Sequence, residues 1–190
     1  MNIGVLALQG DFYRHAAHLK QLDIMPIFVK QPQDLKDCHG LIIPGGESTT
    51  LVKLMKKGGL FDAIPKFNRE RPIFGTCAGA ILASRKVHNR PVDTLNLIDI
   101  EIERNAYGRQ IDSFIDTIDI RLSDEKYTTE AVFIRAPIIR SCGKDVDILS
   151  VHKDDIVMAE NKRVLVATFH PELTESTLIH RYFINKVKKL

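Results

Sequence analysis

Short, continuous apolar runs alternate with amphipathic segments through the first 83 residues of the chain. The apolar runs cover residues 3–8, 25–29, 40–43 and 72–74. Uninterrupted runs of this length are typical of strands buried on both faces of a parallel sheet. Apolar positions at helical spacing predict helices over residues 11–22, 48–55, 60–68 and 78–83. We therefore expect an α/β fold with a largely parallel sheet and right-handed crossovers.

Two polar residues are candidates for helix starts in this half of the chain. Asp11 precedes the first helical pattern and is a plausible N-cap, and Ser48 can cap the helix that follows it.

The second half of the chain changes to an alternating pattern. Residues 99–103 and 114–122 alternate apolar and polar positions, which indicates half-exposed antiparallel strands. Between them, residues 104–109 form a polar loop, and further short strands are expected at 131–135, 147–151, 156–159 and 164–168. The closing segment 173–187 is predicted to be a helix with Leu178, Tyr182, Phe183 and Val187 on its apolar face. No linker or repeat interrupts the chain, so we expect a single domain over residues 1–190.

Composition narrows the class of protein. The chain has 190 residues, 44% hydrophobic and 27% charged, with a formal charge of +3. This balance gives no support for nucleic acid or an acidic membrane as a partner. The chain starts directly with a strand pattern and has no apolar run near the ~18 residues of a membrane span. Its three cysteines do not have the spacing of a disulfide framework or of a zinc site, so we expect neither. This cysteine usage fits a reducing compartment, and we expect the protein to be cytoplasmic.

Cys77 lies between Gly75 and Gly79, directly after the apolar run 72–74 and before a helical segment. A cysteine at such a strand-to-helix turn is held above the edge of the sheet, at the positive end of a helix that favours a thiolate. Flanking glycines permit the strained backbone and the close approach of a substrate that a nucleophile turn requires. The alternative is that Cys77 simply packs in the core, as free cysteines usually do. Because a structural cysteine rarely needs glycines around it, we interpret Cys77 as a nucleophile.

A thiol nucleophile needs a base, and that base needs a group that orients it. His170 follows the apolar strand pattern 164–168 and is held extended by Pro171, so Glu172 can reach one of its ring nitrogens. The alternative is a helix-start turn in which Pro171 and Glu172 merely favour the N-terminus. The remaining histidines are weaker candidates: His15, His18 and His180 are expected at a surface or an interface, His39 and His88 in loops, and His152 after a strand.

Attack on an acyl carbon also requires backbone donors for the oxyanion. Gly45 and Gly46 follow the strand at 40–43, next to the strand of the nucleophile, and the amide of Ala78 follows Cys77. These three residues are the expected oxyanion hole, although a Gly-Gly turn can also be no more than a loop device.

The motif at residues 75–79, together with His170-Pro171-Glu172, resembles the class I, triad-type glutamine amidotransferases. Further blocks sharpen the match, at residues 8–10, 44–50, 103–110, 133–137 and 169–173. Together they resemble the glutaminase subunits of pyridoxal 5'-phosphate synthase over essentially the whole chain. The resemblance implies a flavodoxin-like, three-layer fold with a mostly parallel central sheet and additional antiparallel strands.

The resemblance also implies a reaction. L-Glutamine would be hydrolysed through a γ-glutamyl thioester on Cys77, with His170 as base and then acid and Glu172 orienting it. Ammonia would pass to a separate barrel-shaped synthase subunit, and no cofactor or metal is implied. By the same resemblance, the glutamine contacts are Gly46, Glu47, Ser48, Arg104, Ile134 and Arg135. The oxyanion hole of this family is thought to form when the synthase docks, by reorientation of the peptide near Gly45 and Gly46.

Two positions depart from the family pattern. The segment Asp11-Phe12-Tyr13 follows Gln-Gly where a small residue is usual, near the expected partner-facing end of the sheet, so it bears on the details of docking. Asn96 stands where glycine is common. Asn tolerates left-handed backbone angles, so we expect Asn96 to be accommodated. Two alternatives of different class stay open: a stand-alone cysteine hydrolase of the peptidase or deglycase type on a similar fold, and a non-catalytic module on a degenerate amidotransferase fold.

Overall fold

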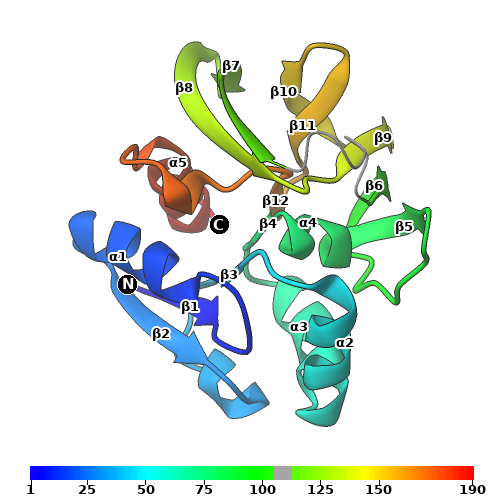
Figure 1. Ribbon diagram of the computed structural model, residues 1–190. Coiled ribbons are helices and arrows are strands. Elements are labelled where there is room, and N and C mark those ends of the chain that lie inside the picture. Colours follow the sequence, from blue (N-terminus) through cyan, green and yellow to red (C-terminus); the bar gives the residue numbers. More distant parts are fainter. Residues whose placement is uncertain (105–112) are drawn as a thin grey trace.

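The computed structural model describes residues 1–104 and 113–190 of the chain (Figure 1). Its strands are β1 Asn2–Leu6, β2 Met25–Val29, β3 Gly40–Ile43, β4 Ile73–Thr76, β5 Ser84–His88, β6 Ile98–Glu103, β7 Ser113–Leu122, β8 Glu125–Ile134, β9 Ile138–Cys142, β10 Asp147–His152, β11 Asp155–Glu160 and β12 Val164–Ala167. Its helices are α1 Phe12–Gln21, α2 Ser48–Lys57, α3 Leu60–Asn68, α4 Ala78–Ala83 and α5 Leu178–Lys188, with short 3-10 turns at η1 Pro32–Leu35 and η2 Pro171–Leu173. Residues 105–110 of the expected polar loop and its family motif lie outside the described residues.

Five parallel strands form the centre of the fold. They lie in the order β2-β1-β3-β4-β12, and each neighbouring pair is parallel. This strand order is flavodoxin-like, in agreement with the fold that the family resemblance implies. Figure 1 shows α1 and α5 on one side of these strands and α2 and α3 on the other, so the sheet is the middle of three layers.

The continuous apolar runs are explained by this layering, because successive side chains in a strand point to opposite faces. In β3, Ile42 packs in the core beneath α1 and α5, whereas Leu41 and Ile43 pack beneath α2 and α3. In β4, Phe74 and Ile73 divide between the same two cores. Both faces of each strand are therefore buried, and no position in the run is left for a polar residue.

Antiparallel strands extend the sheet beyond β12. There β11 pairs with β12, β10 and β9, and β9 pairs with β6, all antiparallel, while β5 returns parallel to β6. The long hairpin of β7 and β8 forms a separate two-stranded sheet within the described residues. Its apolar face, including Ile118, Ile120 and Phe133, packs into the same core as α1 and α5. The predicted combination of a parallel centre and additional antiparallel strands is confirmed.

Several expected boundaries were wrong. The strand expected at 131–135 is the end of β8, which begins at Glu125, and β5 and β9 were not predicted. The first half of β8 was missed because it lies on a projecting hairpin whose residues are mostly polar. The closing helix begins at Leu178 rather than at 173, because the Thr174 amide and hydroxyl both bond the carbonyl of Pro171 and close the η2 turn there.

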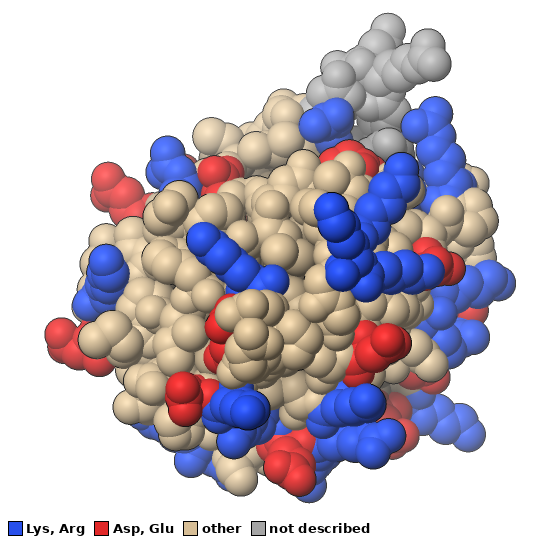
Figure 2. All heavy atoms as spheres, turned by 90° about the horizontal axis from the view of Figure 1, so that it is seen from below, with Lys and Arg blue, Asp and Glu red and all other residues tan. Residues whose placement is uncertain are grey.

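Charged side chains of both signs are mixed on the face of the molecule that Figure 2 shows, in keeping with the small net charge of +3. The helices within residues 1–104 and 113–190 are all too short or too polar to cross a lipid bilayer.

The carboxyl ends of the parallel strands meet at one edge of the sheet. The loop after β1, the Gly45-Gly46 turn after β3, the turn after β4 and the segment after β12 all contribute lining residues to the same cavity. In open sheets of this kind, ligands bind at that edge.

Candidate active site

Cys77 occupies a strained turn between β4 and α4. Its backbone has φ 48° and ψ −105°, a conformation that is costly for any residue with a Cβ. A Cβ on Gly75 would come within 2.6 Å of the Gly79 carbonyl oxygen, and one on Gly79 would overlap the carbonyl oxygen of Ile43. The two glycines therefore allow the turn to fold back tightly onto the sheet. The turn leaves the Cys77 side chain at the wall of the cavity, with the residue 8% exposed.

His170 also lines the cavity and is held there by the segment that follows β12. Its backbone amide donates to the carbonyl of Val132 in β8 at 2.8 Å. Its ring nitrogen Nδ1 lies 2.7 Å from Oε1 of Glu172, and the Cys77 side chain is close enough to the ring to raise its pKa. Because Nδ1 is engaged by Glu172, Nε2 is the ring nitrogen left to face Cys77. The expected relation of Cys77, His170 and Glu172 in space is present.

The charge state of His170 follows from these two neighbours. Burial by itself lowers the pKa of His170, but the neighbouring side chains of Cys77 and Glu172 outweigh it and raise that pKa to about 10. The ring is consequently an imidazolium at neutral pH, held between Cys77 and a carboxylate. Glu172 is 1% exposed and starts the η2 turn with Pro171, so it lies behind the imidazole rather than in the cavity.

The Gly45-Gly46 turn lies against both reacting side chains. A Cβ placed on Gly45 would lie 2.5 Å from Cε1 of His170 and 3.3 Å from Cβ of Cys77. The Gly45 carbonyl oxygen abuts the α-carbon of Gly10, where an added Cβ would overlap it. The backbone of the turn therefore borders both Cys77 and His170, with no room for a side chain at Gly45. Ala78, the third residue expected in an oxyanion hole, directly follows Cys77 as the first residue of α4 and is 1% exposed.

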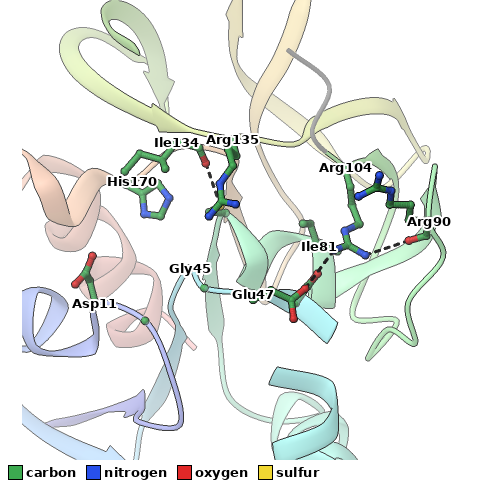
Figure 3. Close-up of a pocket in the computed structure, with 13 residues that line it drawn as sticks. Asp11, Gly45, Glu47, Ile81, Arg90, Arg104, Ile134, Arg135 and His170 are labelled. Atoms are coloured by element: carbon green, nitrogen blue, oxygen red, sulfur yellow. Dashed lines mark hydrogen bonds and ion pairs between the residues drawn. The ribbon is translucent and has the colours of Figure 1, made fainter. Parts of the chain in front are cut away.

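The cavity above Cys77 has a volume of about 380 Å³, within the range of small-molecule sites (Figure 3). Its described lining residues are Gly10, Asp11, Gly45, Gly46, Glu47, Ser48, Cys77, Ile81, Arg90, Arg104, Ile134, Arg135 and His170. All the sequence-predicted site residues are in this set except Glu172 and Ala78, which lie directly behind it. The residue patterns and the resemblance therefore selected residues that the fold brings together.

Charged side chains occupy the end of the cavity away from His170. Arg104 Nη2 lies 3.4 Å from Oε1 of Glu47, and its Nη1 donates to the carbonyl of Arg90 at 3.1 Å. Figure 3 shows the side chains of Arg104 and Glu47 directed toward one another across this end. A zwitterion with a carboxylate and an ammonium group would find counter-charges of both signs here.

Glu47, rather than Ser48, is the N-cap of α2. Its carboxylate accepts from the amides of Thr49 at 3.1 Å and Thr50 at 2.7 Å, and from both hydroxyls. Slight burial raises the pKa of Glu47, but these donors outweigh it and lower the pKa to about 2. The expectation for Ser48 was wrong because Ser48 is already helical and 3% exposed. Asp11 precedes α1 as predicted, but its side chain makes no capping hydrogen bond.

Two further predicted residues follow β8. Ile134 carries the carbonyl that lies 4.0 Å from Sγ of Cys77. Arg135, at the cavity wall, has φ 43°, a left-handed conformation that non-glycine residues seldom adopt. Asn96 also adopts a left-handed angle, φ 50°, which confirms that asparagine is tolerated there.

Sequence reasoning did not propose four of the lining residues, Gly10, Asp11, Ile81 and Arg90, as site residues. Gly10 and Asp11 carried a signal, because they follow β1 at the edge where the other strand ends meet. Arg90 carried none: it lies between β5 and β6 with φ 68°, and only the fold brings it to Arg104.

The expectation for three histidines was also wrong. His15, His18 and His180 were expected at a surface or an interface, but they are 0%, 6% and 0% exposed. The other two cysteines are remote from the cavity lining: Cys38 is buried beneath α2 and α3, where burial raises the pKa of its thiol to about 11, and Cys142 ends β9.

The arrangement has the parts for acyl transfer: a strained nucleophile, an imidazolium oriented by a buried carboxylate, and a glycine turn whose backbone borders the nucleophile. The Cys77 sulfur can attack a carbonyl carbon, and the imidazolium can protonate the group that leaves.

Comparison with known proteins adds the following findings. A family model described as the SNO glutamine amidotransferase family matches residues 5–189 of the chain. The pyridoxal 5'-phosphate synthase subunit PdxT of Thermosipho africanus is 47% identical over 190 residues, with 100% of both chains covered. The protein of the same name from Solibacter usitatus is 48% identical over 189 residues, covering 97% of this chain and 98% of its own.

Solved structures of glutamine amidotransferases have the same fold as this chain. A crystal structure of a glutamine amidotransferase superposes with a TM-score of 0.92 at 39% identity, covering 98% of each chain. A putative GMP synthase protein from Thermoplasma acidophilum has a TM-score of 0.71 at 18% identity, covering 100% of this chain and 94% of its own, and shares the fold alone.

Proposed function

The chain belongs to the SNO glutamine amidotransferase family, and from this premise we propose that it hydrolyses L-glutamine to glutamate and ammonia as the glutaminase subunit of a pyridoxal 5'-phosphate synthase. The observation that carries the proposal is the alignment of Cys77, His170 and Glu172 beneath a cavity with charged groups of both signs. The full-length identity of 47% and 48% to proteins named as subunits of that synthase supports the assignment.

In the first half-reaction, the Cys77 thiolate attacks the side-chain amide carbon of glutamine. The carbonyl electron pair moves to oxygen, and a tetrahedral intermediate forms. His170 then gives its Nε2 proton to the amide nitrogen, and the carbon–nitrogen bond breaks. Ammonia departs, and the γ-glutamyl group remains bound to the Cys77 sulfur as a thioester. Glu172 keeps the ring in place through Nδ1 and stabilises its positive charge before the transfer.

In the second half-reaction, His170 is neutral and acts as a base. Its Nε2 takes a proton from a water molecule, whose oxygen attacks the thioester carbon. Collapse of the second tetrahedral intermediate breaks the carbon–sulfur bond and releases glutamate. The sulfur leaves as thiolate beside a protonated His170, which restores the starting ion pair.

Glutamine recognition is assigned to Gly46, Glu47, Ser48, Arg104, Ile134 and Arg135. Arg104 and Arg135 both line the cavity, and a guanidinium donor from either residue suits the α-carboxylate. Glu47 is ionised because of its low pKa and can meet the α-ammonium group. The backbone of Gly46 and Ile134 borders the part of the cavity next to Cys77.

The oxyanion is assigned to backbone amides at Gly45, Gly46 and Ala78. Each preorganised donor is worth about 2.7–4 kcal/mol in comparable enzymes. The Gly45-Gly46 peptide lacks side chains on both residues, so it can reorient at little cost. A barrel-shaped synthase subunit, docked at the cavity edge of the sheet, is the proposed recipient of the ammonia and the proposed trigger for that reorientation.

The test is an ammonia-release assay with glutamine, run with and without a synthase subunit from a related organism. Wild-type chain in the complex should release ammonia and glutamate in equal amounts, and Cys77→Ala should release none while retaining the unfolding transition of the wild type. Undiminished release by Cys77→Ala would overturn the proposal.

The stand-alone cysteine hydrolase is not favoured, because the relatives at 47% and 48% identity are named as synthase subunits. The non-catalytic module is not favoured either, because all three triad residues are present: Glu172 hydrogen-bonds His170, and Cys77 lies close enough to His170 to raise its pKa.

A further inference from the structure

Glu172 has a second oxygen that the triad does not use. Its side chain is completely buried, and Oε1 is occupied by His170. Within the described residues, Oε2 of Glu172 accepts no hydrogen bond of good geometry. It does form an ion-pair contact with Nε2 of His15, at 3.4 Å. His15 is on α1, also completely buried, and 157 residues away in the sequence. A buried carboxylate oxygen is costly unless a donor faces it, so this contact calls for an explanation.

The protons of the neighbouring rings can be assigned from the contacts. An ionised carboxylate only accepts hydrogen bonds, so the His15 Nε2 that faces Glu172 carries a proton. The same Nε2 lies 3.3 Å from the Thr76 hydroxyl oxygen. His15 Nδ1 lies 2.9 Å from His180 Nε2, so in a neutral His15 it is bare and accepts the proton of His180. Nδ1 of His180 is then bare, which agrees with its having no hydrogen-bond partner in the described part of the chain.

The surroundings keep His15 neutral. Burial, followed by the charges that His180, His170 and His18 could carry, lowers the pKa of His15 well below its usual range. Burial and His18 likewise lower the pKa of His180 to about 3. A charged His15 would compete with the His170 imidazolium for Glu172, whereas a neutral donor orients the carboxylate without competing for its charge.

We propose, on the basis of the proposed function, that His15 is a positioning residue for the triad: the electrostatic contact of its Nε2–H with Oε2 of Glu172, at 3.4 Å, keeps Oε1 directed at His170. His180 acts one step further back, because its Nε2–H fixes the tautomer of His15. The line of contacts runs from Cys77 through His170, Glu172 and His15 to His180, and Figure 1 shows α1 and α5, which carry the last two, side by side over one face of the sheet.

This arrangement makes specific demands on a replacement for His15. Glutamine places a side-chain amide nitrogen near the position of Nε2, whereas the asparagine side chain is one methylene shorter and cannot reach Glu172. The two variants are a matched pair, because both bury one amide at the same site. We expect His15→Gln to keep kcat within about threefold of wild type, and His15→Asn to lower kcat about 10- to 100-fold, as loss of an outer partner of an active-site ligand does.

Three further readouts separate positioning from a general loss of structure. The KM for glutamine should stay within twofold for both variants, because His15 is not in the cavity lining. In a Glu172→Ala background, His15→Asn should cost less than a further twofold, because the group through which it acts is gone. The exposed His39, changed to Asn as a control, should leave kcat unchanged. His180→Phe, which removes the donor to His15, should lower kcat at constant KM.

The rate at which iodoacetamide alkylates Cys77 tests the same contacts without any glutamine. The alkylation rate should fall for His15→Asn and stay at the wild-type value for His15→Gln. This result does not depend on whether glutamine is the substrate. If instead the wild-type complex fails to act on glutamine, only the proposed function is lost. Equal kcat or equal alkylation rates for the Asn and Gln variants, an undiminished effect of His15→Asn in the Glu172→Ala background, or unchanged kcat in His180→Phe would overturn the role of His15.

Discussion

The substitution Gly45→Ala isolates the spacing between the glycine turn and the triad. The new methyl carbon would lie 2.5 Å from Cε1 and 3.2 Å from Nδ1 of His170. Ordinary contact begins near 3.4 Å, so the imidazole would have to retreat by about 0.9 Å. The ring cannot retreat freely, because Nδ1 is held at 2.7 Å by Glu172.

The consequence for catalysis can be estimated from that displacement. A misplacement of about 1 Å at a reacting group costs on the order of 100-fold in rate, or about 2.7 kcal/mol of transition-state stabilisation. Overpacking of this kind destabilises a fold by about 1–3 kcal/mol, which a domain of ordinary stability survives. We therefore expect Gly45→Ala to be folded at 25 °C but to hydrolyse glutamine about 100 times more slowly in the synthase complex.

Two measurements locate the cause of the loss. The rate of Cys77 alkylation by iodoacetamide reports the thiolate and imidazolium pair, whereas an effect confined to the oxyanion hole would leave that rate unchanged. Gly58→Ala is the matched control, because a Cβ there meets nothing closer than 3.4 Å and its φ of −90° suits alanine. Its activity should stay within twofold of wild type. Gly45→Ala protein with wild-type hydrolysis and wild-type alkylation would refute the close approach on which this reasoning depends.

Three other outcomes follow from the site. An electrophilic glutamine analogue should label Cys77 and leave Cys38 unmodified, since Cys38 is buried and its pKa is raised to about 11; peptide mapping that finds the label on Cys38 would reassign the nucleophile. Arg135→Ala should raise the KM for glutamine about 10- to 100-fold, because that is the effect of losing one hydrogen bond to a charged group, and kcat should change less. An unchanged KM would contradict the role assigned to Arg135. Glu47→Ala should lower the free energy of unfolding by about 1 kcal/mol at pH 7. Because the pKa of Glu47 is lowered in the folded state, its contribution is present above pH 4.5 and is lost as the pH falls toward 2, so chemical denaturation should find the two proteins converging in acid; a constant difference would count against the cap.

The centre of the fold was predictable because burial on both faces leaves a direct mark on the sequence. Strands such as β3 and β4 must be apolar throughout, and the helices between them must be apolar on one side. The α/β class, the flavodoxin-like fold and the family resemblance are confirmed by the topology and by the matches to known proteins. Cys77 was recognisable because its strained turn requires glycine at positions 75 and 79. His170 was recognisable because Pro171 fixes the turn that follows it.

What the sequence did not predict depends on contacts between distant segments. The first half of β8 is held by pairing with β7 rather than by its own pattern, and nothing local marks it. Glu47 took the capping role expected of Ser48 because the chain enters α2 one residue earlier in extended conformation. His15 and His180 are 165 residues apart, and only the packing of α1 beside α5 turns two unremarkable histidines into a buried pair.

The central claim is that Cys77 forms an acyl bond to the substrate with His170 as its acid and base. It is tested most directly by mixing the synthase complex with glutamine, quenching in acid during turnover, and measuring the mass of the intact chain and of its Cys77 peptide. The account predicts a γ-glutamyl adduct on Cys77, which accumulates in His170→Asn if ammonia release still occurs and is absent from Cys77→Ala. Steady ammonia release with no adduct on Cys77 at any quench time, or an adduct on another residue, would contradict it.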